Sequence, residues 1–96
     1  MSHAITPVES ETSVLALGRW IDGLTALANR AKTDAAVTGL CETIFDLERD
    51  LALRPARTLP AVLVKLRRLV AAADEGENDN TPDLIRSVYE DLQGMI

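Results

Sequence analysis

The sequence has few of the residues on which catalytic and metal-binding sites are usually built. Its 96 residues include one cysteine, one histidine and one each of tryptophan, tyrosine and phenylalanine. A lone Cys41 forms no internal disulfide, and with only His3 beside it there are too few ligands for an ordinary zinc site. We expect the terminus that carries His3 to be frayed, so no Ser-His-Asp or Cys-His pair is positioned by structure. We therefore predict no catalytic, cofactor-binding or metal-binding residues.

Long apolar runs and glycine-rich loops are missing as well. No stretch approaches the ~20 apolar residues that a membrane-spanning helix requires, and no GxGxxG phosphate-binding pattern is present. The first residues, MSHAITPVESETS, contain no basic segment followed by an apolar one, so we expect no signal peptide. A single thiol fits a reducing compartment. Together these features predict a cytoplasmic protein with no membrane partner.

The composition is that of one acidic helical domain covering residues 1–96. Leu, Ala and Val dominate a hydrophobic fraction of 47%, and Leu and Ala favour helix. No segment alternates apolar and polar residues for long enough to predict a strand. The net charge of −5 repels nucleic acid unless the basic residues gather in a patch, so a nucleic-acid partner is not expected.

Apolar residues recur at helical spacing in four segments, about 8–31, 34–53, 59–73 and 82–94. The segments begin at candidate caps, with Thr6, Thr33, Thr58 and Thr81 each at or next to a helix start. Most of the joints are short, which predicts an all-α, up-down bundle of four helices. Residues 1–7 are predicted to be flexible, and residues 74–81 to form an acidic, mobile loop.

A helical wheel predicts which face of each helix enters the core. Trp20, Cys41 and Phe45 fall on the apolar arcs of their helices, and we expect all three to be core residues. The predicted core arc of segment 59–73 comprises Leu59, Val62, Leu63, Leu66, Leu69, Val70 and Ala73. Three apolar residues fall off their arcs and form a weak indication of a dimer surface: Leu15, Leu53 and Val64. At the glycines of the first helix, Gly18 and Gly23, we expect close packing or a slight bend.

Glu48 interrupts the apolar arc of the second helix. A carboxylate at such a position must reach water, pair with a cation or stay protonated. Its place near the helix end favours the interpretation that it leans out to solvent. A buried ion pair with Arg54, Arg57 or Lys65 is the second interpretation, and a functional carboxylate is the third.

Half of the basic residues lie in one part of the chain, and no acid occurs between Leu51 and Ala73 to offset their charge. This basic cluster comprises Arg54, Arg57, Lys65, Arg67 and Arg68. Its members on the third helix spread widely around the wheel, which is typical of a solvated face. Residues 61–73 also lack the Asn, Gln, Ser and Thr that accompany bases on a DNA-reading helix.

The stretch RPARTLP, residues 54–60, predicts a joint between two helices. Pro55 disfavours helix at Arg54, and Pro60 suits a first helical turn. Arg57 stands beside the N-terminus of the third helix, where free N–H groups can bind an anion. The candidate contacts for an anion or a partner are Arg54, Arg57, Lys65 and Arg68.

Residues 40–70 resemble a group of small helical proteins of alphaproteobacteria that have no established activity. The shared features are a Trp in the leading helix, the pair Leu47-Glu48, the joint 55–58 (PART here) and the pair Lys65-Leu66. Where that group has a small residue or Gly shortly after the joint, this chain has Pro60-Ala61. The resemblance implies a bacterial, all-helical protein and carries no activity with it.

A second resemblance is to the all-helical chorismate mutases, which have about this length. Ile21-Asp22, Arg30 and Gln93 are similar to residues of that family in outline. The family also needs a Lys and a Glu spaced to hold the substrate between helices, and the second helix here has no Lys. The first helix of the chorismate mutases is also longer than the first helix predicted here, which stops by Thr33.

These observations favour a non-enzymatic module that binds another protein or itself as a homodimer. The alternative is a nucleic-acid accessory protein of phage or mobile-element type that acts through the basic third helix. A small helical enzyme, of chorismate mutase type or using Glu48 and nearby arginines, is the third possibility.

Overall fold

A computed structural model describes the backbone of residues 7–96 and the side chains of residues 13–96. It contains four helices, α1 (Pro7–Arg30), α2 (Asp34–Leu53), α3 (Leu59–Glu75) and α4 (Thr81–Gly94), and no strand between residues 7 and 96. The predicted all-α fold of four helices is therefore confirmed, with boundaries that differ by two residues at most. The cap at Thr6, the position of His3 and almost all of the flexible segment 1–7 lie outside the described residues.

Local side-chain chemistry accounts for the helix starts. The Thr33 hydroxyl accepts a hydrogen bond from the Ala36 amide at 3.2 Å, and the Thr58 hydroxyl accepts one from the Ala61 amide at 3.4 Å. The cap of α4 is Asn80, one residue before the predicted Thr81. Arg54 has an extended backbone before Pro55, and α2 ends there as the joint predicts.

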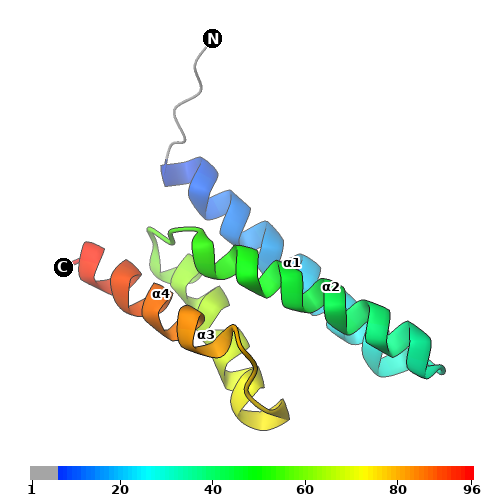
Figure 1. Cartoon of the computed structure of the whole chain (residues 1–96). Helices are drawn as coiled ribbons and strands as arrows, with labels where there is room; N and C mark the ends of the chain where they lie inside the picture. The colour runs from blue at the N-terminus through cyan, green and yellow to red at the C-terminus, as the bar shows by residue number, and fades with distance from the viewer. Residues whose placement is uncertain (1–6) are drawn as a thin grey trace.

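The four helices form two hairpins that pack against each other (Figure 1). In the first hairpin α1 packs along α2, and in the second α3 packs along α4 in the opposite direction. The hairpins meet where α3 contacts α1 and where α4 contacts α2, while α1 and α4 share no contact among the described residues. The end of the first hairpin where α1 meets α2 extends beyond α3 and α4 (Figure 1).

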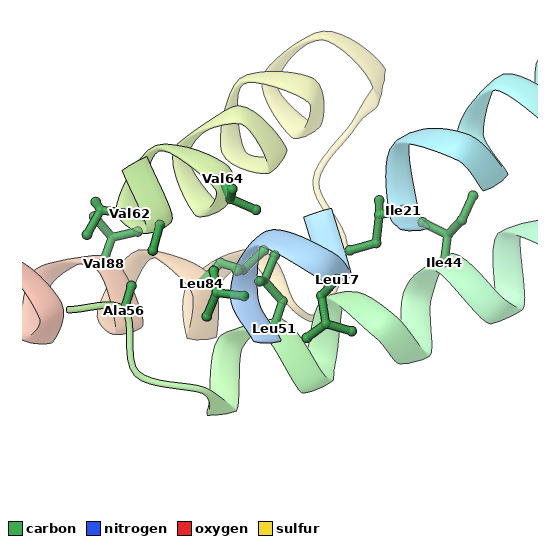
Figure 2. Packing of buried hydrophobic residues seen from close by; sticks show 11 residues of the cluster. Leu17, Ile21, Ile44, Leu51, Ala56, Val62, Val64, Leu84 and Val88 are labelled. Carbon is green, nitrogen blue, oxygen red and sulfur yellow. The ribbon is translucent and has the colours of Figure 1, made fainter. Parts of the chain in front are cut away.

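Small and medium-sized aliphatic residues fill the core. Figure 2 shows residues of all four helices and of the 54–58 joint meeting there, with Val62 of α3 beside Val88 of α4. The buried set comprises Val14, Leu17, Ile21, Ile44, Leu51, Ala56, Ala61, Val62, Val64, Leu84 and Val88. Val14, Leu17 and Ile21 are the contribution of α1 to this set.

Gly18 allows α1 and α3 to approach closely. A Cβ atom at this position would lie 2.5 Å from Cγ1 of Val64, whereas a Cβ at Gly23 would meet nothing within 4 Å. Close packing is thus confirmed at Gly18 and absent at Gly23. Val64 is buried against this glycine, so its predicted placement outside the core was wrong.

We expect Gly18→Ala to destabilise the protein and Gly23→Ala to stabilise it. Each change gains about 1 kcal/mol of helix propensity, but at Gly18 the new methyl group must displace a stiff β-branched side chain, which costs about 1–3 kcal/mol. Urea unfolding at one fixed protein concentration measures both variants. Equal stabilisation by the two changes would contradict the close α1–α3 contact.

The core-facing side of α3 was predicted wrongly for most of its arc, although Val62 is buried as predicted. Its buried residues are Ala61, Val62, Val64, Lys65 and Arg68. The side chains of Leu59, Leu63, Leu66 and Val70 are instead 38–67% exposed. The wheel assigns an apolar arc to the core by default, but here two charged residues have partners in the interior and take that place.

Two further core assignments were wrong, those of Trp20 and Cys41. The Trp20 side chain is 59% exposed and Cys41 is exposed, while Phe45 is half-buried. The apolar residues of α1 and α2 spread over a wider arc than the side of each helix that contacts its neighbours. The remaining apolar residues of the first hairpin are therefore left at the surface, as Leu53 is at 77% exposure.

Candidate interaction surface

Lys65 is completely buried between α3, α4 and the 54–58 joint, where a solvated position was expected. Its ammonium group donates to the Arg54 carbonyl at 2.6 Å, the Ser87 hydroxyl at 2.7 Å and the Asp91 carboxylate at 2.6 Å. An ammonium has three N–H donors, so each has an acceptor. These contacts compensate the loss of water around the buried charge.

Asp91 extends this contact to the backbone of the joint. One carboxylate oxygen accepts from Lys65, and the other accepts from the amide of Ala56 at 3.1 Å. A single side chain of α4 therefore holds both α3 and the joint that precedes it. The joint RPARTLP is positioned by this carboxylate, which lies 35 residues later in the chain than Ala56.

Glu48 forms the second buried charge pair, with Arg68 of α3. The carboxylate is 5% exposed and accepts from the Arg68 guanidinium at 3.2 Å and from the Asn78 side chain at 3.4 Å. The favoured solvent-facing interpretation was wrong, and the predicted buried ion pair is confirmed with a different partner. The predicted candidates were Arg54, Arg57 and Lys65, and of these Arg54 pairs with Asp50 and Lys65 with Asp91.

The loop between α3 and α4 is attached to α2 beside this pair. Asn80 is buried, and its side-chain amide donates to the Phe45 carbonyl at 2.9 Å. Thr81 is also buried, while Glu77 and Asp79 are exposed. The acidic segment is therefore solvated in part and anchored at its end by two asparagines, and its mobility stays a prediction.

The remaining members of the basic cluster do not form a continuous positive surface. Arg54 lies 3.2 Å from the carboxylate of Asp50, and Arg67 lies 3.1 Å from that of Asp22. With Lys65 and Arg68 paired in the interior, four of the five cations are matched by acids. Arg57 is exposed and makes no ion pair with the described residues.

An open groove of about 670 Å³ lies between the 52–57 segment and the C-terminal half of α4. Arg54 and Arg57 line it together with Glu90 and Asp91, so it carries both charges. Ser87 is also in the wall, 2.7 Å from the Lys65 ammonium. This pair is no activated nucleophile, because an ammonium paired with Asp91 has no free electron pair to accept the serine proton.

The residues of the chorismate mutase resemblance are not brought together. Ile21 is a core residue, and Asp22 pairs with Arg67 on the surface. Arg30 is exposed at the end of α1, and Gln93 of α4 donates to the hydroxyl of Tyr89. Because α1 and α4 share no contact among the described residues, these groups do not line one substrate site.

Within the described part of the chain, no cluster of His, Cys, Asp and Glu could hold a metal ion. None of its helices combines the length and the apolar character needed to cross a membrane.

The largest unpaired feature is an apolar surface on the second hairpin, here called the outer face. Its residues on α3 follow one another at intervals of four, three and four, and the same intervals recur on α4 and its C-terminal end. The outer face comprises Leu59, Leu63, Leu66 and Val70 from α3, and Ile85, Tyr89, Leu92 and Ile96 from α4 and the chain end.

Both stripes are turned away from the first hairpin. At 100° per residue, the centre of the α3 stripe lies about 160° from the centre of the buried side of that helix. On α4, Asp83, Arg86, Ser87 and Glu90 line a groove against α2, and the stripe lies about 140° from their mean direction. It lies about 95° from the centre of the buried residues of α4, which face α3 as well as the first hairpin. The two stripes therefore lie on the same side of the α3–α4 hairpin.

The outer face is large for a monomer. Its eight residues are between 38% and 106% exposed, which amounts to on the order of 900 Å² of exposed residue surface with backbone atoms included. The largest apolar patch on a typical monomer covers ~300–600 Å². The sequence analysis had assigned the α3 stripe to the core. The exposed apolar intervals were visible in the sequence, but which helix faces met inside was not.

Comparison with known proteins adds no relative to these observations. No family model, curated protein or solved structure matches this chain. The function is therefore inferred from the described residues themselves.

Proposed function

We propose that this protein is a non-enzymatic helical module that binds a protein partner through the outer face of its α3–α4 hairpin. The observation that carries the proposal is the exposure of two parallel apolar stripes on one side of the molecule. Leu59 is 67% exposed, Val70 64% and Tyr89 61%, although other residues of the same helices are fully buried.

The spacing of the stripes supports docking of helices. Intervals of four and three residues place side chains in one row along a helix, which is the arrangement that lets them interlock with a neighbouring helix. Scattered apolar residues on a surface need no explanation, but eight of them in two adjacent rows do. Leaving them in water forgoes about 1.5–3 kcal/mol for each large side chain that could be fully buried.

The charges of the described residues favour this proposal over an enzyme or a nucleic-acid accessory protein. The groove beside α4 places Ser87 next to a protonated amine, and the basic cluster is largely neutralised by acids. No side chain in either stripe is charged, so a partner would gain affinity from apolar contact rather than from phosphate binding.

We expect the double change Leu63→Gln with Leu66→Gln to leave the fold of the protomer intact. Gln favours helix about as well as Leu, and an exposed substitution changes stability by at most about 0.5 kcal/mol. The variant should bind much less of an environment-sensitive apolar dye than the wild type in dilute solution. Circular dichroism, urea unfolding and dye fluorescence measure these properties.

Leu51→Gln is the matched control, because Leu51 is fully buried. Placing an amide there removes apolar packing and buries an unpaired polar group, so we expect a loss of about 3 kcal/mol or more. The outer-face variant could lose as much unfolding free energy as Leu51→Gln while the unfolding midpoint of the wild type does not depend on protein concentration. These leucines would then belong to the protomer's own core. The proposed docking surface would then be wrong.

A further inference from the structure

We infer that the partner of the outer face is a second copy of this chain, packed about a two-fold axis. The inference rests on the proposed function and specifies its partner. In this homodimer the α3–α4 hairpins of the two copies pack face to face in the middle, and the α1–α2 hairpins lie on the outside.

The pattern of the outer face matches itself. α3 and α4 run in opposite directions (Figure 1). Each stripe covers twelve residues, which is an axial rise of about 16 Å in a helix, although the last residue of the α4 stripe, Ile96, follows the end of that helix. A two-fold axis that lies in the interface, above the middle of this hairpin, lays each stripe of one copy on a stripe of the same length in the other. The equal intervals of four, three and four then allow side chains of facing helices to interlock.

The area of the outer face is that of a stable dimer. Covering on the order of 900 Å² on each copy buries about 1,800 Å² in total, within the ~1,200–2,000 Å² of specific protein–protein interfaces. Isologous contacts of this kind are the commonest in homo-oligomers, because one self-complementary patch serves both subunits. A partner that covered only one stripe would leave the other in water.

Charge separates a second copy from a membrane surface. Helices that lie on membranes carry several Lys and Arg residues beside the apolar face. Here Lys65 and Arg68 of α3 are buried, Arg67 is paired with Asp22, and Arg86 of α4 lines the groove against α2. A net charge of −5 also repels anionic lipid. It repels a second copy at long range too, so the apolar contact must supply the attraction, and added salt should preserve or tighten the dimer by screening.

Sedimentation equilibrium or light scattering across a concentration series tests the inference. We expect the wild type to approach twice its monomer mass of 10.4 kDa. The double variant Leu63→Glu with Leu66→Glu should stay folded and dissociate at least about 100-fold more readily, since four carboxylates would meet in an apolar interface. Leu53→Glu is the matched control: Leu53 is an exposed leucine of α2 outside the outer face, and this variant should dimerise like the wild type.

A wild type that stays monomeric throughout the series would overturn the inference. So would a dimer that Leu53→Glu weakens and the outer-face changes do not. If the α3 variant fails to fold, Ile85→Glu with Tyr89→Glu on α4 applies the same test from the other stripe. A monomeric wild type could still bind the apolar dye through its outer face, and the Leu63→Gln/Leu66→Gln variant could still fold. That result would exclude a second copy as the partner and would leave the docking proposal in place.

Discussion

Lys65→Met is expected to destabilise this protein by about 3–5 kcal/mol, the range found when one partner of a buried ion pair is removed. Methionine retains most of the length and apolar character of the lysine stem. It leaves the carboxylate of Asp91, which is 7% exposed, and the carbonyl of Arg54 without the ammonium between them. A protein of this size has about 5–15 kcal/mol of stability in total. Denaturant unfolding at one fixed concentration measures the loss.

Arg67→Met is the matched control for this substitution, because Arg67 forms an exposed pair on the same helix. Its side chain is 55% exposed and that of Asp22 is 50% exposed, so the change should cost at most about 1 kcal/mol. Adding Asp91→Asn to Lys65→Met should recover part of the loss. The amide removes the buried negative charge and keeps an oxygen for the Ala56 amide. A Lys65→Met variant as stable as Arg67→Met would contradict the buried network.

Glu48→Gln should also cause a large loss, about 3 kcal/mol, which corresponds to a fall in melting temperature of more than about 10 °C for a domain of this size. The change preserves the shape of the side chain and one oxygen for Arg68. It leaves the buried guanidinium, whose side chain is 10% exposed, without a negative partner.

Asp22→Asn is the control for Glu48→Gln. It makes the same chemical change opposite another arginine of α3, but at the surface, so the melting temperature should fall by no more than about 4–8 °C, which corresponds to 1 kcal/mol. Thermal unfolding followed by circular dichroism compares the two variants at equal concentration. Similar losses in both would show that the environment of Glu48 is not the buried one described here.

The two buried pairs also determine which way α3 faces. Turning α3 by about 160° would bring its leucine stripe into the core, but Lys65 and Arg68 would then lose Asp91 and Glu48 and leave two carboxylates buried without partners. The polar contacts thus favour the rotation that keeps the leucines outside. The same contacts hold the outer face in position for the proposed second copy.

Local structure could be predicted from the sequence because its causes lie within a few residues. Thr33 and Thr58 accept hydrogen bonds from amides three residues later, and Pro55 acts on the residue directly before it. The helical period was equally clear, so the four helices and the all-α class followed from it. The stretch RPARTLP is a joint for these local reasons.

Tertiary structure alone decided which helix faces meet and which charges are buried. Glu48 and Arg68 are 20 residues apart in the chain, and Lys65 and Asp91 are 26 apart. No local pattern marks such partners, because a wheel records where a side chain points on one helix and not what stands opposite. Whether a leucine stripe or a lysine occupies the interior depends on the acids that the neighbouring helices bring to it, and those positions exist only once the hairpins have packed.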